Sequence, residues 1–165
     1  MDIRIRAAAA DDAALILRFI NELAIYEKAE EQVVATVESI EASLFRGASP
    51  ARALICEADG EPAGFAVYFF SYSTWLGRQG LYLEDLYVSP RFRGAGAGKR
   101  LLHALARIAL ENGCGRFEWS VLDWNAPAIR FYERIGASAQ SEWVRYRLAG
   151  DALCAFASEA PSDAA

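Results

Sequence analysis

The sequence has few residues that would build a disulfide framework, a metal site or a membrane anchor. Its three cysteines, Cys56, Cys114 and Cys154, are spread over 165 residues without paired spacing, which indicates neither disulfides nor a zinc site. No apolar run approaches the about 18 residues of a membrane helix, and the N-terminus lacks the apolar stretch of a signal peptide. We therefore expect a cytoplasmic protein with reduced thiols, no metal and no membrane partner.

Positive charge is also scarce. The chain carries 17 Lys and Arg against 22 Asp and Glu, a net charge of −5. A nucleic-acid partner is not expected, because it would require a basic face over the whole domain. Apolar residues make up 54% of the chain, enough at this length to close one hydrophobic core. We expect a single domain over residues 1–165, with residues 158–165 as a flexible tail.

Apolar periodicity predicts the order of the secondary structure elements. Alternation of apolar and polar residues, or short apolar runs between turn residues, indicates strands, and apolar residues at steps of three and four indicate helices. The order predicts a mixed sheet with helices on both faces. The expected strands are 2–7, 52–58, 61–74, 80–88, 116–122 and 142–148, and the expected helices are 9–31, 36–45, 98–113, 125–136 and one that begins at 150.

The most informative segment is RFRGAGAGKR at 91–100, with glycine on three alternate positions. A nucleotide-hydrolase phosphate loop would need Ser or Thr where Arg100 stands, and a dinucleotide fingerprint would need glycine where Lys99 or Leu101 stands. Both motifs are excluded. Backbone N–H groups at a helix N-terminus, with basic side chains near them, favour a polyphosphate ligand. The alternative is a flexible connection with solvated basic side chains.

The segment LEDLYVSPRFRGAGAGKRLL resembles the acetyl-coenzyme A motif of the GNAT N-acetyltransferases, in which a strand precedes an Arg/Gln-x-x-Gly-x-Gly/Ala loop. The blocks NELAIYEKAEEQV, GFAVYFFSYSTWLG, DWNAPAIRFYERIGA and GDAL are similar, in order, to the diamine (spermidine/spermine) and thialysine N-epsilon-acetyltransferases. The resemblance covers most of residues 1–155. It implies an α/β (α+β) fold with a mixed, mostly antiparallel twisted sheet of six to seven strands and helices on both faces.

The resemblance also implies an activity and a coenzyme site. It implies transfer of an acetyl group from acetyl-coenzyme A to a primary amine of a small molecule, by direct attack in a ternary complex, in a homodimer. An acceptor on a protein N-terminus or lysine, or a non-catalytic acyl-coenzyme A sensor, are the alternatives. The coenzyme would contact Leu86, Tyr87, Val88, Arg93, Gly94, Ala95, Gly96, Ala97, Gly98, Lys99, Asn125 and Tyr132.

Acetyl transfer to an amine needs a base, a group that stabilises an oxyanion and an acid. In a regular strand Asp85 would project with Leu83 and Tyr87, and Glu84 to the other face, so each carboxylate would have apolar neighbours and a raised pKa. The resemblance assigns the base to Glu84, acting directly or through water, and places Asp85 beside the substrate. The alternative is that both carboxylates pair with nearby arginines.

Tyr132 is the candidate acid. A phenol with a pKa near about 10 can protonate a departing thiolate, and the resemblance places Tyr132 at the general acid position. The alternative is a core tyrosine with a structural hydrogen bond. Asn125 opens the same expected helix as its N-cap, and the resemblance adds a contact to the pantetheine arm.

Acidic and aromatic side chains would select a cationic amine. One departure concerns the acceptor: the polyamine enzymes carry Asp in YDPW, whereas this chain has Ser73 and Thr74. Loss of that anion favours short amines or thialysine-like amino acids over spermidine. The alternative for Tyr26 and Trp75 is an ordinary core position. The candidate amine contacts are Tyr26, Glu27, Tyr72, Trp75, Glu84 and Asp85.

Overall fold

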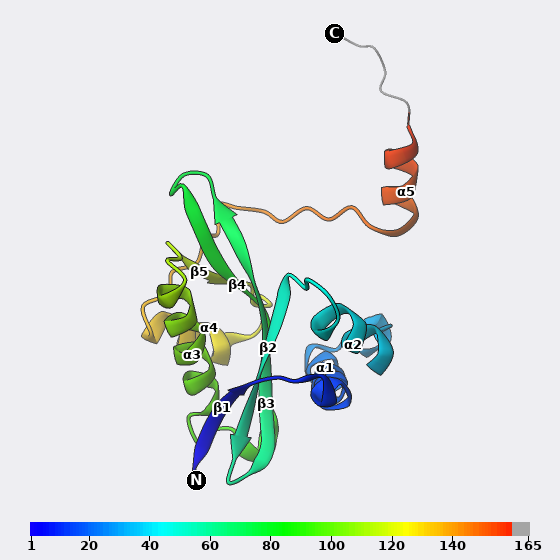
Figure 1. Cartoon of the computed structure of the whole chain (residues 1–165). Coiled ribbons are helices and arrows are strands. Elements are labelled where there is room, and N and C mark those ends of the chain that lie inside the picture. Colours follow the sequence, from blue (N-terminus) through cyan, green and yellow to red (C-terminus); the bar gives the residue numbers. More distant parts are fainter. Residues whose placement is uncertain (160–165) are drawn as a thin grey trace. The chain divides into compact units, whose positions relative to one another are not determined.

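The computed structural model describes residues 1–159, and the chain forms two compact units, one over residues 1–122 and one from residue 123 onward. The first unit contains a sheet in which the strands follow the order β1-β2-β3-β4-β5 (Figure 1). β1 to β4 are antiparallel and β5 is parallel to β4, as expected for a mixed, mostly antiparallel sheet. The strands are β1 (Ile3–Ala7), β2 (Ala51–Ala58), β3 (Glu61–Ser73), β4 (Arg78–Val88) and β5 (Phe117–Trp119).

Over residues 1–159 the sheet has five strands, so the prediction of six to seven was wrong. The segment expected as a strand at 142–148 forms no ladder with any described strand. A strand needs a neighbour that satisfies its N–H and C=O groups, and alternating residues alone do not supply one. Side chains of this segment are instead exposed: Trp143 by 68%, Val144 by 75% and Tyr146 by 95%.

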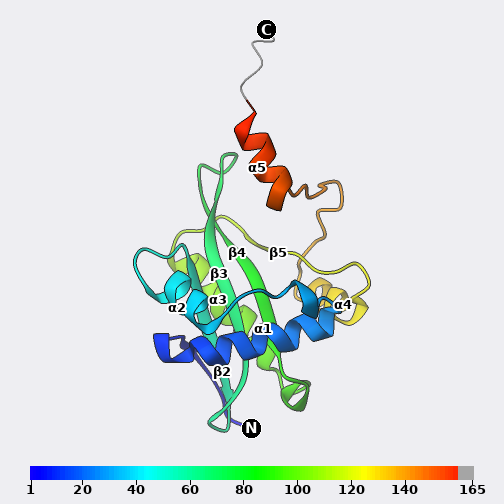
Figure 2. The same ribbon diagram turned by 90° about the vertical axis from the view of Figure 1, so that its right-hand side faces the viewer.

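Helices cover both faces of the sheet in the first unit. α1 crosses the strands on one face and α2 lies beside it, while α3 lies on the other face (Figures 1 and 2). Within residues 1–159, no helix combines the length and apolar character needed to cross a bilayer. The helical segments of this unit are η1 (Ala10–Asp12), α1 (Ala13–Glu27), η2 (Glu30–Gln32), α2 (Val37–Phe45), η3 (Pro90–Phe92) and α3 (Ala97–Glu111).

The starts of α1 and α2 show how local side chains cap, or do not cap, a helix. α2 begins with a reciprocal capping box, in which the Ser39 N–H donates to the Thr36 hydroxyl and the Thr36 N–H donates to the Ser39 hydroxyl. Asp12 directly precedes α1, as expected of a cap, but its side chain makes no capping bond to that helix. Its carboxylate binds Arg6 and the backbone N–H of Ala9 instead.

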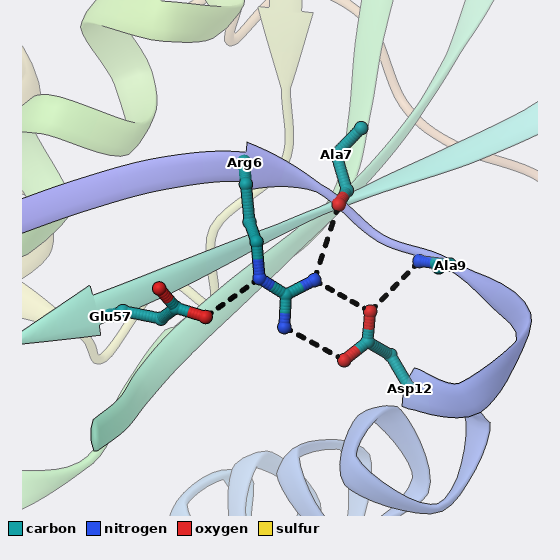
Figure 3. A network of polar contacts seen from close by, with 5 residues as sticks. All are labelled: Arg6, Ala7, Ala9, Asp12 and Glu57. Atoms are coloured by element: carbon teal, nitrogen blue, oxygen red, sulfur yellow. Dashed lines mark hydrogen bonds and ion pairs between the residues drawn. The ribbon is translucent and has the colours of Figure 1, made fainter. Parts of the chain in front are cut away.

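Arg6 joins three elements of the first unit (Figure 3). Its guanidinium donates to both carboxylate oxygens of Asp12, at 2.7 and 2.9 Å, and to Glu57 in β2 at 2.7 Å. The hydrogen bonds from Arg6 lower the pKa of Asp12, and the two carboxylates raise the pKa of Arg6. The network therefore links β1, β2 and the segment before α1.

The hydrophobic core lies on both sides of the sheet. Beneath α1, the ring of Phe19 stacks on that of Phe65 with centroids 5.6 Å apart, and Ile16 is fully buried beside them. On the opposite side, Leu101 and Leu105 of α3 are fully buried. Each such side chain contributes about 1.5–3 kcal/mol relative to exposure. These contacts hold β4 between the two helical layers, where the candidate site lies.

The described part of the second unit contains α4 (Ala126–Arg134) and α5 (Gly150–Ser158). Asn125 caps α4 as predicted, because its side-chain oxygen accepts the N–H of Ala128 at 3.4 Å. Gly136 follows with a φ of +90°, as suits a residue that ends a helix. Of the predicted tail, Ser158 is the last residue of α5, and residues 160–165 lie outside the described part of the chain.

Candidate functional site

β4 contains one extra residue where the two candidate carboxylates lie. Leu83 pairs with Tyr68 of β3, whereas Asp85 pairs with Val67, the residue next to Tyr68. Glu84 therefore has no counterpart in β3 and forms a β-bulge. Bulges redirect side chains and are common next to active sites.

The bulge changes which side chains share a face. Cross-strand partners project to the same side of a sheet, and Val67, the partner of Asp85, packs against the core beneath α1. Phe69, two residues along β3, is the partner of Tyr82. Tyr82 and Asp85 therefore both face α1. The prediction that Asp85 projects with Leu83 was wrong, because a regular alternation does not include the extra residue.

Asp85 is a half-buried carboxyl group of the site. Burial, together with the negative charges of Glu84 and Glu27, raises the pKa of Asp85 to about 6. Glu27 is the last residue of α1, and burial raises its pKa as well. Glu84 is exposed, whereas Asp85 has the raised pKa that was expected. The result is an acidic cluster beneath the end of α1.

Arg93 lies against the same face from the loop after β4. Its guanidinium carbon is 5.0 Å from the ring centroid of Tyr26 and 5.5 Å from that of Tyr87. Its Nε donates to the carbonyl oxygen of Val88 at 2.8 Å. This contact was missed by sequence reasoning, because no local pattern relates the end of α1 to a loop 67 residues later. Tyr26, Glu27 and Asp85 are thus brought to one face, with Arg93 beside them.

The end of β4 presents an open edge toward β5. β5 pairs with Leu81, Tyr82 and Leu83 only, while β4 continues to Val88. Among residues 1–159 no strand pairs with Leu86–Val88 on that side. An extended ligand can add to such an open edge as a further strand.

The glycine loop leads directly into α3. Gly94 and Gly96 have φ values of +81° and +89°, which L side chains rarely adopt, and open space surrounds the position that a Cβ would occupy at either. Gly96 is the N-cap of α3, and its carbonyl oxygen accepts the N–H of Arg100 at 3.0 Å. The N–H groups of a first turn have no partner within the helix and lie at its positive end. The loop therefore offers backbone donors to an anion.

Three basic side chains near the glycine loop, those of Arg91, Lys99 and Arg100, contact other parts of the first unit. Arg91 forms an ion pair with Glu61 at 2.5 Å, and Arg100 donates to the carbonyl oxygen of Ile3 at 3.1 Å. Lys99 lies on the β1 side of α3, where it lines a shallow hollow of about 460 Å³. An anion at the loop would therefore be bound chiefly by backbone N–H groups. The hollow is lined by Ile3, Ile5, Lys99, Arg100, His103, Ala104 and Arg107.

The aromatic residues expected to contact the amine from the β3–β4 hairpin lie at its end. Tyr72 is 64% exposed and Trp75 88% exposed. β3 runs five residues from Val67, the partner of Asp85, to Tyr72, a distance of roughly 17 Å at strand spacing. Ser73 is 3% exposed, and its hydroxyl accepts the Leu76 N–H at 3.2 Å within the turn. The fold does not bring these hairpin residues to Asp85.

Tyr132 lies in α4 of the second unit, and Asn125 is the N-cap that precedes this helix. They are seven residues apart, about two helical turns, so they lie on the same side of the helix. The Tyr132 ring is half-buried and packs against Phe131 with centroids 5.8 Å apart. In the described part of the chain, no group of three or more His, Cys, Asp or Glu side chains is arranged to hold a metal ion.

Comparison with known proteins places this arrangement in a family. The acetyltransferase (GNAT) family profile matches residues 19–137. A thialysine N-epsilon-acetyltransferase of Sus scrofa is 42% identical over 161 residues, covering 90% of this chain and 94% of the relative. An L-ornithine N5-acetyltransferase of Arabidopsis thaliana is 48% identical over 94 residues, covering 57% of this chain and 41% of the relative.

A solved structure has a similar fold. An integron cassette protein from the mobile metagenome of V. cholerae superposes with a TM-score of 0.80 at 28% identity, covering 96% of this chain and 99% of that one. The family profile and the thialysine acetyltransferase both extend over the glycine loop and the β4 bulge. The chain therefore belongs to the GNAT family of acetyltransferases.

Proposed function

We propose that this acetyltransferase transfers the acetyl group of acetyl-coenzyme A to the primary amine of a small molecule, by direct attack in a ternary complex. The observation that carries the proposal is that one unit combines a backbone anion site at the start of α3, an open edge on β4 and the half-buried Asp85 with its raised pKa. GNAT acetyltransferases use acetyl-coenzyme A. The two relatives described above are named for thialysine and ornithine, which both end in a primary amine.

The residues present fit the coenzyme. Gly94 and Gly96 leave open the space that a Cβ would fill, so a pyrophosphate can approach the backbone closely. The open edge at Leu86–Val88 suits the amide groups of a pantetheine arm, and Asn125 is assigned to the same arm. The coenzyme supplies an activated acetyl thioester. The proposed coenzyme contacts are Leu86, Tyr87, Val88, Arg93, Gly94, Ala95, Gly96, Ala97, Gly98, Lys99, Asn125 and Tyr132.

The proposed chemistry divides between a base and an acid. Glu84 removes a proton from the ammonium group, and the freed nitrogen lone pair attacks the acyl carbon. Because Glu84 is exposed at the bulge, transfer through water and release of the proton to solvent fit its position. Tyr132 donates its phenolic proton to the sulfur as the carbon–sulfur bond breaks, and the nitrogen releases its second proton to solvent, from which Tyr132 is reprotonated, so that the products are an acetamide and a thiol.

Charge and aromatic contacts would hold the amine. Asp85 and Glu27 supply anions beneath the end of α1, and Tyr26 supplies an aromatic face. Burial strengthens the attraction between a carboxylate and an ammonium group. Tyr72, Trp75 and Glu84 are further predicted contacts, and the assignment of the two hairpin aromatics stays a prediction, since their strand positions lie far from that of Asp85.

We further propose that the enzyme is a homodimer. The segment 142–148 of the second unit carries the apolar residues Trp143, Val144 and Leu148, which suit an interface with a second copy. Burial of such a surface against a second copy contributes about 25 cal/mol per Å². Sedimentation velocity tests the association state. The single domain, cytoplasmic location and absence of metal, membrane or nucleic-acid partners stay predictions.

An amine panel with acetyl-coenzyme A and a thiol-release assay tests the function. We expect ornithine, lysine and thialysine to have higher kcat/KM than spermidine, because Ser73 and Thr74 replace the family's Asp. Transfer to lysine-containing peptides but to no free amine would favour the protein-directed alternative. A preference for spermine over every short amine by about tenfold or more, roughly 1.4 kcal/mol, would contradict the inference from Ser73.

The glycine loop has its own test. Gly96→Ala should weaken coenzyme A binding in calorimetry by roughly tenfold or more, because the substitution strains a positive φ where the backbone must approach the ligand. Gly47→Ala is the matched control, since Gly47 also has a positive φ, +74°, and open space around it. Equal coenzyme affinities in the two folded variants would show that the glycine loop does not bind the coenzyme.

A further inference from the structure

Glu22 joins α1 to the end of β4. Its Oε2 accepts a hydrogen bond from the hydroxyl of Ser89 at 2.9 Å, between residues that are 67 positions apart in the sequence. Its Oε1 lies 3.5 Å from Nε of Arg18, one turn earlier on the helix. Ser89 directly follows Val88, the last residue of β4. The Glu22 carboxylate therefore ties the helix to the residue at which the strand ends.

This contact belongs to a row along one face of α1. Phe19, Glu22 and Tyr26 are three and four residues apart, so they project to the same side of the helix. The ring centroid of Phe19 lies 6.2 Å from that of Tyr87. The ring centroid of Tyr26 lies 5.0 Å from the guanidinium carbon of Arg93. Burial and the negative charge of Glu22 raise the pKa of Tyr87. This face of α1 thus runs along the end of β4 and the residues after it.

The end of β4 does not depend on Glu22 for its place in the sheet. The backbone N–H of Ser89 donates to the carbonyl oxygen of Ala63 at 2.9 Å, which fixes the strand to its neighbour β3. The last turn of α1 has less support, because residues 25–27 are all exposed. Loss of the hydrogen bond between Glu22 and Ser89 should therefore displace the end of the helix and leave the strand in place.

We propose that Glu22 is a positioning residue for the amine, which holds the end of α1, with Tyr26 and Glu27, in place through its hydrogen bond with Ser89. This inference rests on the proposed function and deepens it, since both side chains at the helix end are proposed amine contacts. Small displacements of the groups that orient a substrate lower the rate of its reaction. The contact should therefore affect transfer to the amine and leave the affinity for the coenzyme unchanged.

The test measures transfer by the full-length enzyme to ornithine, lysine, thialysine or spermidine, whichever has the highest kcat/KM. Ser89→Ala should lower this kcat/KM by roughly three- to tenfold, the range for one hydrogen bond. Ser89→Thr keeps the hydroxyl and should stay within about twofold of wild type. In both variants the Kd of coenzyme A, measured by calorimetry, should also stay within about twofold.

Two further variants separate the hydrogen bond from the negative charge of Glu22. Glu22→Gln removes the charge but keeps an oxygen that accepts the Ser89 hydroxyl, so its kcat/KM should stay closer to wild type than that of Ser89→Ala. Glu22→Ala removes the acceptor, and the double variant with Ser89→Ala should lose no more activity than Glu22→Ala alone, because the two residues share one contact. A purely electrostatic role would instead impair Glu22→Gln and spare Ser89→Ala.

Ser43→Ala is the matched control, because the Ser43 hydroxyl donates to Ile40 within α2, and its kcat/KM should stay within about twofold of wild type. Wild-type kcat/KM in Ser89→Ala, or an equal loss in Ser89→Thr, would overturn the proposal. So would a coenzyme affinity that falls as much as kcat/KM does. Glu22→Ala gives the same comparison if Ser89→Ala does not fold. Absence of transfer to any amine by the wild-type enzyme would instead overturn the proposed function.

Discussion

Among single residues, Asp85 links the stability of the fold to pH. Its pKa of about 6 in the folded protein lies above the ordinary 3.8 of Asp. Between these values the folded protein keeps a proton that the unfolded chain has released, so stability decreases as pH rises through this range. The free energy of unfolding is lowered by roughly 2–3 kcal/mol above pH 6.

Asp85→Asn should therefore stabilise the protein and impair it as an enzyme. At neutral pH we expect Tm to rise by about 5 °C, since the buried charge is gone, and at about pH 4 the gain should vanish because Asp85 is then protonated. The kcat/KM for an amine should fall by about tenfold or more with the lost charge contact. Thermal scans at both pH values and steady-state kinetics measure these effects.

The exposed Asp11 provides the control. Asp11→Asn should change Tm by less than about 1 °C at either pH, as is usual for a surface substitution. If Asp85→Asn failed to stabilise the protein at neutral pH, the raised pKa of Asp85 in the folded protein would be refuted.

Tyr132→Phe removes a hydroxyl and leaves the ring contact with Phe131 in place. For a general acid we expect kcat to fall by about 10²–10⁴ with little change in coenzyme affinity. Rapid-quench kinetics and calorimetry separate the two quantities. As a control, Tyr146→Phe, at a 95% exposed tyrosine, should leave kcat and coenzyme affinity unchanged. If kcat of Tyr132→Phe decreased by less than about threefold, Tyr132 would have a structural role and not that of the general acid.

At the scale of elements, Gly64 determines how closely β3 and β4 approach. A Cβ at Gly64 would collide with the carbonyl oxygen of Tyr87 and would lie 3.1 Å from the Cα of Val88. Gly64→Ala should thus force the strands apart and destabilise the fold by about 1–3 kcal/mol, as overpacking does. Because the displaced residues include the open edge of β4, coenzyme affinity should fall as well.

Gly98→Ala is a matched substitution for the stability measurement. Its Cβ would meet only the Val88 side chain at 3.9 Å, within α3, so the variant should be as stable as wild type or more stable by up to about 1 kcal/mol. Urea unfolding of both variants provides the comparison. Equal stabilities would show that the sheet adjusts freely at Gly64.

The elements also show what could be predicted from the sequence. The helices α1, α2 and α3 and the hairpin at Asp59 and Gly60 follow local patterns of apolar periodicity, capping and turn residues, and all four are present. The bulge at Glu84 could not be predicted, because one extra residue in a ladder depends on the partner strand. The segment 142–148 has the alternation of a strand but no described neighbour.

The candidate site likewise has features that could be predicted from adjacent residues and features that could not. The glycine loop was predictable, since positive φ angles and a helix start depend on adjacent residues. The contact of Arg93 with Tyr26 joins segments far apart in the sequence, and the side of β4 to which Asp85 points depends on the bulge. Long-range packing thus decides the features that a single sequence leaves open.

At the scale of the molecule, the Arg6 network fastens β1 and β2 to the segment before α1. The pKa of Asp12 is lowered by Arg6, so its contribution to stability is present above the ordinary Asp pKa and is lost as pH falls through the folded value. The network should therefore stabilise the protein at neutral pH, and this stabilisation should be lost in acid.

Arg6→Met should lower the free energy of unfolding at neutral pH by about 2 kcal/mol, within the range for hydrogen-bonded charges. The difference from wild type should shrink in acid, as pH falls through the lowered pKa of Asp12. Arg46→Met breaks an ion pair with Glu41 in which the Arg46 side chain is 70% exposed, so it should cost less than about 1 kcal/mol. If both variants lowered the free energy of unfolding by the same amount, the role assigned to Arg6 would be contradicted.

The open edge of β4 also affects how the protein should be handled. Unpaired strand edges are templates for intermolecular β-pairing and aggregation, and this edge, Leu86–Val88, is apolar in sequence. A ligand that occupies the edge covers the template and shifts the folding equilibrium toward the native state by mass action. Preparations without coenzyme A should consequently become turbid faster on storage than preparations that contain it.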